Sequence, residues 1–107
     1  MEKNNLPACP VETTLLLISN RWKILIIQNL LTETKRFKQL QRSLNGITPK
    51  VLTSNLKDME KAGLLTRTVY AEVPPRVEYS LTSTGLSLQP ILEEMAVWGK
   101  IYQEKEL

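Results

Sequence analysis

The stretch 46–63 places the strictest limits on the fold, because it carries a full set of signals for starting and stopping a helix. Thr48 is a natural N-cap, and Pro49 suits the first helical position, where its missing N–H costs nothing. Gly63 supplies the left-handed residue that commonly ends a helix. We therefore predict a helix over residues 48–61.

This predicted helix is amphipathic. Its apolar side chains recur at helical spacing and form one face, which consists of Val51, Leu52, Leu56 and Met59. At about 100° per residue, a polar and basic set falls on the opposite side: Lys50, Thr53, Ser54, Lys57 and Lys61. Such a helix is typical of one that reads DNA, but an ordinary surface helix kept soluble by its lysines shows the same pattern.

A shorter helix is predicted directly before it. Phe37, Leu40 and Leu44 recur at helical spacing, after a short strand or extended link at the preceding basic pair. Only residues 45–47 separate the two helices, which is the helix-turn-helix pattern. We assign this motif to about residues 37–62.

After Gly63 the spacing of apolar residues changes from 3.6 to 2, which predicts a strand over residues 64–71. Pro74 and Pro75 prevent regular pairing and form the tip of a loop, and residues 76–81 alternate again. Two antiparallel strands with a basic, proline-containing tip, placed after the helix that could read DNA, predict a β-wing. A plain structural hairpin is the alternative.

Two helices are predicted near the N-terminus, after a polar arm of residues 1–8. The first covers about residues 10–18 and has a proline at its first position, and Asn20 caps the second, which covers about residues 21–32. The second helix is apolar nearly all round, so it is expected to form the centre of the core.

The C-terminal part is helical from Thr82, and Pro90 is expected to kink or restart the helix. An apolar and aromatic stripe follows at helical spacing: Leu88, Ile91, Leu92, Met95, Trp98, Ile101 and Tyr102. This stripe is too large to bury fully within a domain of this size. We therefore predict a dimerisation helix over about residues 83–105 that pairs with its symmetry mate, with the first helix as a further candidate partner. Packing on its own domain alone is the alternative.

The charge of the chain is localised. The 107 residues suffice for one domain, and the formal net charge is only +3. Residues 35–76 carry nine basic and three acidic side chains, whereas residues 1–34 carry three of each and residues 77–107 carry two basic and five acidic. The basic excess therefore surrounds the predicted helix-turn-helix, as expected of a protein that binds a polyanion.

The chain has one cysteine and no histidine. This composition excludes an intrachain disulfide, a zinc site within one chain and the usual Ser-His or Cys-His nucleophile pairs. We expect no enzymatic activity, no cofactor and no metal site. No apolar run approaches the ~20 residues that span a membrane, and the N-terminus lacks a signal-peptide pattern. A lone cysteine fits a reducing cytosol, so we expect a cytoplasmic protein with no membrane partner.

Short motifs follow one another along nearly the whole chain. They are Cys9–Glu12, Arg21–Lys23, Arg36–Phe37 with Leu40, Gly46–Thr53, Asn55–Leu56, Glu60–Leu64, Tyr70, Val73–Tyr79, Leu81–Thr82, Gly85, Leu88, Pro90 and Trp98–Gly99. With these motifs the chain resembles the HxlR-type winged helix-turn-helix transcriptional regulators of bacteria, which are related to the MarR group. It departs from their pattern at the cap of the second helix, where they often have Gly-Gly-Lys-Trp or Gly-Lys-Trp and this chain has Ser19–Asn20–Arg21–Trp22.

The resemblance implies an α+β fold in which residues 1–107 form a single winged helix-turn-helix domain. This domain is mainly helical, with a two- to three-stranded wing at about residues 64–82 and the terminal dimerisation helix. The resemblance also implies a homodimer that presents two such units to double-stranded DNA. Such a dimer places its recognition helices in successive major grooves of a roughly palindromic operator, about one helical turn apart.

The expected DNA contacts divide by role. Candidates for base edges are polar residues of the recognition helix: Lys50, Thr53 and Ser54. Lys57 is expected to contact bases or phosphate, and the helix start at Thr48 and Pro49, with its free N–H groups, is placed for a phosphate. Three basic residues at or in the preceding helix are expected to hold the phosphate backbone: Arg36, Lys38 and Arg42. Arg76 beside the wing tip is the candidate for the minor groove or its flanking phosphates. For each lysine alone, a solvated side chain without contacts is the alternative.

Cys9 lies just before a predicted helix start, where the helix dipole favours its thiolate form. Some members of the resembled family have a cysteine here that senses quinones, aldehydes or disulfide stress. Cys9 is therefore a candidate for redox sensing, through modification or an intersubunit disulfide. The alternative is a small apolar residue at the dimer junction.

The competing function is a winged-helix module for protein–protein contact without specific DNA binding. The central basic excess and the polar face of the helix 48–61 argue against it, because an interaction module is expected to show an apolar patch there. A protein that binds single strands or RNA would need exposed aromatic residues on a sheet, and the aromatic residues here are spread through helices and wing.

Overall fold

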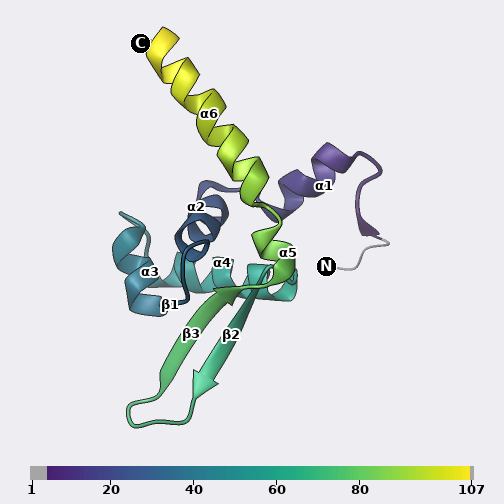
Figure 1. Ribbon diagram of the computed structural model, residues 1–107. Coiled ribbons are helices and arrows are strands. Elements are labelled where there is room, and N and C mark those ends of the chain that lie inside the picture. The colour runs from purple at the N-terminus through teal and green to yellow at the C-terminus, as the bar shows by residue number, and fades with distance from the viewer. Residues whose placement is uncertain (1–4, 107) are drawn as a thin grey trace.

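The computed structural model describes residues 5–106, and Figure 1 shows its helices and strands. Residues 1–4 of the predicted polar arm and Leu107 lie outside the described residues. The elements, in chain order, are α1 (Pro10–Leu17), α2 (Arg21–Leu30), β1 (Lys35–Arg36), α3 (Phe37–Ser43), α4 (Pro49–Lys61), β2 (Leu65–Tyr70), β3 (Arg76–Leu81), α5 (Ser83–Leu86) and α6 (Gln89–Glu106). This order confirms the predicted winged helix-turn-helix, with α3 and α4 as its two helices.

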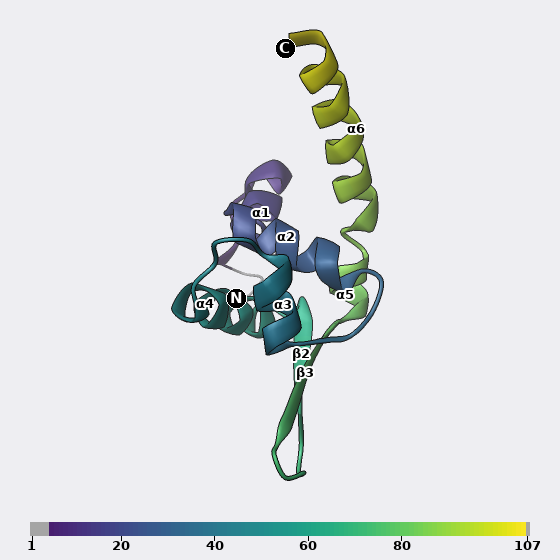
Figure 2. The same cartoon turned by 90° about the vertical axis from the view of Figure 1, so that its left-hand side faces the viewer.

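The wing is a three-stranded antiparallel sheet in the order β1-β3-β2. Strands β2 and β3 pair along their full length, from Leu65 opposite Leu81 to Tyr70 opposite Arg76. The short β1 adds Lys35 opposite Tyr79 at the base. The hairpin extends away from the helices in both views (Figures 1 and 2), so its tip is held clear of the domain.

The core lies where α2 packs against α4 and the base of the sheet. Ile26 and Ile27 of α2 are completely buried, as expected for a helix that is apolar nearly all round. The end of α2, the helices α3 and α4, the turns that follow them and the sheet contribute further buried side chains to the same cluster: Leu30, Leu40, Leu44, Ile47, Leu52, Leu56, Met59, Leu64, Leu65 and Tyr79. This cluster connects the helix-turn-helix to the wing.

The predicted caps are present. The Thr48 hydroxyl accepts the backbone N–H of Val51 at 3.2 Å, and Asn20 Oδ1 accepts that of Lys23 at 3.0 Å. Gly63 ends α4 in the left-handed region, with φ at +80°. These local bonds explain why the bounds of α2 and α4 follow so closely from the sequence, although α2 ends at Leu30, two residues earlier than predicted.

The predicted apolar face of α4 is wrong at one position. Val51 is exposed, and the buried face is completed by Asn55, which is only 7% exposed. Asn55 lies one turn after Val51 and between the buried residues Leu52 and Met59. The face that packs on α2 is therefore rotated from the one that hydrophobicity alone predicts.

Helix α6 extends from the domain in the direction opposite to the wing (Figures 1 and 2). Its predicted dimer stripe is corrected at its start, because Leu88 is 8% exposed and belongs to the core, and Leu92 packs against that core. The remaining residues of the stripe are exposed within this chain: Ile91, Met95, Trp98, Ile101 and Tyr102. Within residues 5–106, no helix combines the length and the apolar character that crossing a membrane requires.

Candidate nucleic-acid interface

The exposed side of α4 carries most of the residues that the sequence assigned to base contact. Lys50, Ser54 and Lys57 are exposed, and Thr53 is half-buried. Thr53 and Lys57 line a groove of about 460 Å³ between α4 and the sheet, together with Arg67 of β2. The polar face of α4 is therefore directed partly outward and partly toward the wing.

A second groove, of about 660 Å³, lies between α3 and the wing. Arg36, Lys38 and Arg42 line one side of it, and Arg76 lines the other. Phe37 lines both this groove and the one beside α4, so the two adjoin. The fold thus brings together the four basic residues that the sequence placed on the phosphate backbone and in the minor groove, although α3 and β3 are far apart along the chain.

Arg76 is held against the wing by its neighbours. Its guanidinium carbon lies 4.1 Å from the centroid of the Tyr70 ring, which is a cation–π contact. Its Nε lies 3.6 Å from a carboxylate oxygen of Glu72 and 3.6 Å from one of Glu78. This Nε is buried and has no hydrogen-bond partner within the described chain. Two carboxylates therefore offset the positive charge that the sequence assigned to the wing.

The start of α4 is capped as predicted. The Val51 N–H is bonded to the Thr48 hydroxyl, and the Leu52 N–H is bonded to the Thr48 carbonyl oxygen. Both bonds are those expected of a capped helix, the first from the N-cap side chain and the second as the first bond within the helix, so the phosphate contact at this helix start stays a prediction. Thr48, Pro49 and Lys50 are exposed, so the helix start itself is accessible.

The sequence assigned no role to two polar residues of this region, one exposed and one buried. Arg67 is exposed on β2 and faces the same groove as Lys57. The alternation of the strand did not mark Arg67, because residue 67 falls on the same face as Leu65 and Val69; its only signal in the sequence was its positive charge. Asn55 lies on the inner face of α4, and its signal was a polar residue in the middle of an apolar face.

Cys9 has an exposed, free thiol at the start of α1. Its carbonyl oxygen accepts the N–H of Thr13 at 3.1 Å, so it forms the N-cap position, as expected. Val11, Leu15 and Leu16 of the same helix are exposed as well. Cys9 therefore lies at the edge of an exposed apolar surface on α1.

Comparison with known proteins identifies the family. The family model described as "HxlR-like helix-turn-helix" matches residues 17–107. The HTH-type transcriptional regulator BH0655 of Halalkalibacterium halodurans is 48% identical over 97 residues, which cover 89% of this chain and 85% of that protein. YdeP, an HTH-type transcriptional regulator of Bacillus subtilis, is 41% identical over 97 residues, which cover 91% of this chain and 76% of that protein.

Among solved structures, the redox regulator HypR in its reduced form is similar, with a TM-score of 0.85 and 40% identity over 89% of this chain and 94% of that chain. The oxidised form of HypR has a TM-score of 0.81 and 42% identity. The relatives are transcriptional regulators and not enzymes, as the sequence predicted. With the family match extending over most of its length, this chain belongs to the HxlR-like helix-turn-helix family of transcriptional regulators.

Proposed function

We propose that this protein is a homodimeric regulator that binds double-stranded DNA sequence-specifically. In this proposal α4 enters the major groove, and the wing near Arg76 lies on the minor groove. The observation that carries the proposal is the shared location of the exposed face of α4, the basic residues of α3 and the wing, which line two adjoining grooves.

The size and chemistry of α4 suit the major groove. An α-helix with its side chains is ~10–12 Å wide, which matches the ~12 Å width of that groove. Lys50 offers donors for guanine O6 and N7, and the Ser54 hydroxyl can donate or accept. Both side chains are exposed on the same helix, one turn apart. Thr53 and Lys57, on the side that faces the sheet, contact bases or phosphate at the edge of the groove.

The basic residues in α3 and directly before it supply contacts that do not depend on the DNA sequence. Arg36, the last residue of β1, and Lys38 and Arg42 of α3 are exposed and line the groove that adjoins the one beside α4. When α4 is in the major groove, these side chains lie near the phosphates that border it. They are expected to contribute affinity and its dependence on salt, whereas α4 contributes specificity.

The wing contact requires an exchange of partners. Arg76 is already engaged by Glu72 and Glu78, so it reaches a phosphate only by weakening these contacts. Its stacking on Tyr70 keeps the guanidinium at the wing surface during this exchange. We therefore expect Arg76 to contribute less affinity than an unpaired arginine would.

The exposed surface of α6 supports a dimer. Its apolar and aromatic side chains are 39–68% exposed at Ile91, Met95, Trp98, Ile101 and Tyr102. Trp98 and Tyr102 stack with their ring centroids 5.3 Å apart, which forms a continuous aromatic surface. A contiguous apolar surface of this kind is characteristic of an interface, and pairing with a second copy buries the same patch on both chains.

Control through Cys9 is the second part of the proposal. HypR, which is similar in fold and sequence, is described as a redox regulator with reduced and oxidised forms. In this chain the thiol of Cys9 is exposed beside the apolar surface of α1. Modification of Cys9, or a disulfide to a second copy, is expected to change the dimer geometry and thereby the affinity for DNA.

The DNA-binding proposal is tested by selecting duplexes from a random-sequence pool and measuring mobility shifts at fixed salt. Lys50→Ala and Arg76→Ala are expected to weaken binding to the selected duplex without unfolding the dimer. Lys100→Ala is the matched control, because it removes an exposed lysine from α6, which extends away from the wing (Figure 1). Unchanged affinity of both Lys50→Ala and Arg76→Ala would refute the proposed interface.

Salt dependence separates this function from a protein–protein module. Binding through phosphates is expected to fall by about 0.9 log units of affinity per log unit of salt for each phosphate bound. A protein–protein module would show no preference among duplexes and no such slope.

The Cys9 proposal is tested by mass spectrometry after mild diamide or quinone treatment, with Cys9→Ser in the binding assay. A Cys9 that stays unmodified excludes it.

A further inference from the structure

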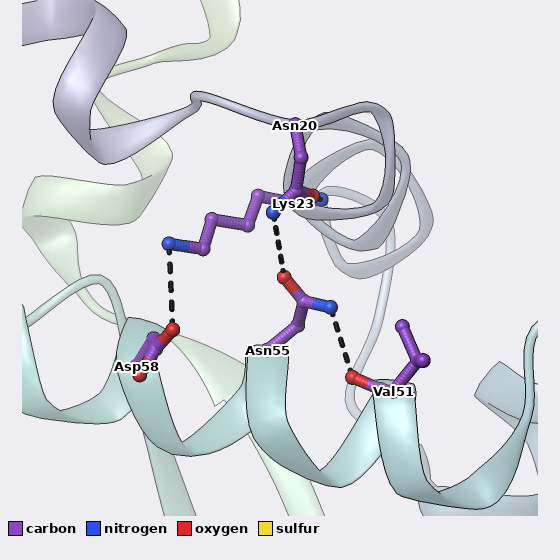
Figure 3. A network of polar contacts seen from close by, with 5 residues as sticks. All are labelled: Asn20, Lys23, Val51, Asn55 and Asp58. Atoms are coloured by element: carbon purple, nitrogen blue, oxygen red, sulfur yellow. Dashed lines mark hydrogen bonds and ion pairs between the residues drawn. The ribbon is translucent and has the colours of Figure 1, made fainter.

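A chain of side-chain amides joins the start of α2 to α4 (Figure 3). Asn20 Nδ2 donates to Asn55 Oδ1 at 3.0 Å, and Asn55 Nδ2 donates to the carbonyl oxygen of Val51 at 2.8 Å. On its other side, Asn20 Oδ1 accepts the backbone N–H of Lys23 at 3.0 Å. The Asn20 side chain therefore caps α2 and holds α4 at the same time.

Asn55 depends on this partner. It is 7% exposed and is surrounded on its helix by the buried residues Leu52, Leu56 and Met59. A buried amide without a hydrogen-bond partner is costly, so buried polar groups are nearly always satisfied. Asn20 supplies the donor to Asn55 Oδ1, and Val51 supplies the acceptor.

The amide network is also the most directional contact between the two helices. The other buried side chains of α2 and α4 are apolar: Ile26, Ile27, Leu30, Leu52, Leu56 and Met59. Apolar burial is non-directional, whereas a hydrogen bond restricts distance and angle. The neighbouring ion pair of Lys23 with Asp58 has an N–O distance of 3.7 Å, and the Asp58 side chain is 62% exposed, so it restricts α4 only weakly.

The network lies next to the residues proposed to read DNA. Val51 directly follows Lys50, and Asn55 directly follows Ser54, so a rotation or slide of α4 on α2 displaces Lys50 and Ser54 as well. Hydrogen bonds to base edges tolerate only a few tenths of an ångström in distance. A small displacement therefore affects base contacts more than phosphate contacts made by long, flexible side chains.

We propose that Asn20 is a positioning residue for DNA recognition, which sets the orientation of α4 through its bond to Asn55. The inference rests on the proposed DNA-binding function and adds the residue that fixes the reading helix. The glycine that the family pattern often has at this position would form neither bond. The positioning is thus a property of the asparagine in this chain.

Three variants separate positioning from helix capping and from general stability. Asn20→Ser keeps an oxygen that caps α2 but is too short to donate to Asn55. Asn20→Gly loses both bonds. Asn29→Ala is the control for losing an asparagine of α2 that does not bond to α4, because Asn29 donates to the carbonyl oxygen of Leu25 in the same helix and accepts a 3.4 Å bond from Lys35 of β1.

The assay is fluorescence anisotropy with two duplexes at fixed salt, at a temperature where circular dichroism shows every variant folded. One duplex is selected from a random pool by the wild-type protein, and the other has the same composition in shuffled order. Asn20→Ser is expected to lose about fivefold in affinity for the selected duplex, the size of one neutral hydrogen bond. Its affinity for the shuffled duplex is expected to stay within roughly twofold, because phosphate contacts carry no sequence information.

The ratio of the two affinities distinguishes the outcomes. A merely structural role of Asn20 lowers the thermal midpoint but leaves the ratio at the wild-type value, and that result overturns the inference. The ratio is expected to be unchanged in Asn29→Ala and lowered in Asn20→Gly. A wild-type protein that prefers no duplex overturns the proposed function, whereas a wild-type preference that Asn20→Ser retains in full overturns the positioning role alone.

Discussion

Gly85→Ala tests how α5 is seated at the base of the wing. Gly85 is buried, and a Cβ added there would lie 2.1 Å from the carbonyl oxygen of Leu64 and 3.0 Å from Leu81 Cδ2. Because non-bonded heavy atoms need more than ~3 Å, α5 must move by roughly 1 Å. The same carbonyl oxygen accepts the N–H of Thr82 at 3.0 Å, so the movement also strains this hydrogen bond.

The expected loss of stability follows from these contacts. Overpacking a well-packed site costs about 1–3 kcal/mol, and this clash with backbone belongs at the upper end. Weakening one neutral hydrogen bond adds about 1 kcal/mol. The better helix propensity of alanine offsets up to about 1 kcal/mol of this destabilisation. We therefore expect Gly85→Ala to lower the free energy of unfolding by about 3 kcal/mol.

Urea unfolding followed by circular dichroism measures this change. The protomer concentration must be held constant, because the unfolding midpoint of a dimer such as the one proposed depends on it. Thr84→Ala is the control, since Thr84 is exposed in the same short helix and its replacement is expected to change stability by less than about 0.5 kcal/mol. If the free energy of unfolding of Gly85→Ala also lies within about 0.5 kcal/mol of the wild-type value, the close approach of α5 to Leu64 is refuted.

The remaining predictions concern α4, α6 and the wing. Thr48→Ala removes the hydroxyl that accepts the Val51 N–H and is expected to lower the free energy of unfolding by about 1 kcal/mol in the same urea titration, whereas Thr48→Ser keeps it. Trp98→Asp places a charge in the exposed stripe of α6 and is expected to shift the dimer to monomer in sedimentation velocity; Lys100→Ala is expected to leave the dimer intact. Combining Glu72→Gln with Glu78→Gln frees the charge of Arg76 and is expected to steepen the salt dependence of DNA binding by about 0.9 log units for each additional phosphate that the wing neutralises. Titrations at several salt concentrations measure this slope, and an unchanged slope contradicts the prediction.

The bounds of most elements are predictable because local residues set them. Thr48 and Asn20 bond to N–H groups three residues ahead, and Gly63 alone supplies the positive φ that ends α4. The β2–β3 hairpin of the wing is equally local, because the alternation of these two strands and the prolines at the tip lie within residues 64–81, whereas β1 joins the sheet through a long-range pairing with β3. The order of elements that makes a winged helix-turn-helix follows from these signals without any long-range contact.

The errors occur where a distant contact decides. Hydrophobicity placed Val51 in the core and left Asn55 unassigned, but Asn55 is buried because Asn20, 35 positions earlier, satisfies its amide. Leu88 falls on the predicted dimer stripe by spacing alone. Leu88 lies in the break between α5 and α6, where its side chain is buried in the core of its own domain.

A count of charges along the sequence also misses contacts that form only in the fold. Residues 35–76 carry a clear basic excess, and the fold does place Arg36, Lys38 and Arg42 together in one groove. The count nevertheless treats Arg76 as a free charge. Pairing of β2 with β3 brings Tyr70 opposite Arg76, and Glu72 and Glu78 flank it, so its charge is partly offset before any DNA is present.

Two polar contacts thus orient the two parts of the domain that are proposed to face DNA. The apolar core determines which faces of α4 and of the wing are buried, but it leaves rotation and side-chain direction weakly restricted. The bond from Asn20 to Asn55 restricts α4, and the carboxylates of Glu72 and Glu78 restrict Arg76 on the wing. Because the first contact holds a helix by a neutral bond and the second holds a charge that phosphate competes for, loss of the first should reduce specificity and loss of the second should raise non-specific affinity.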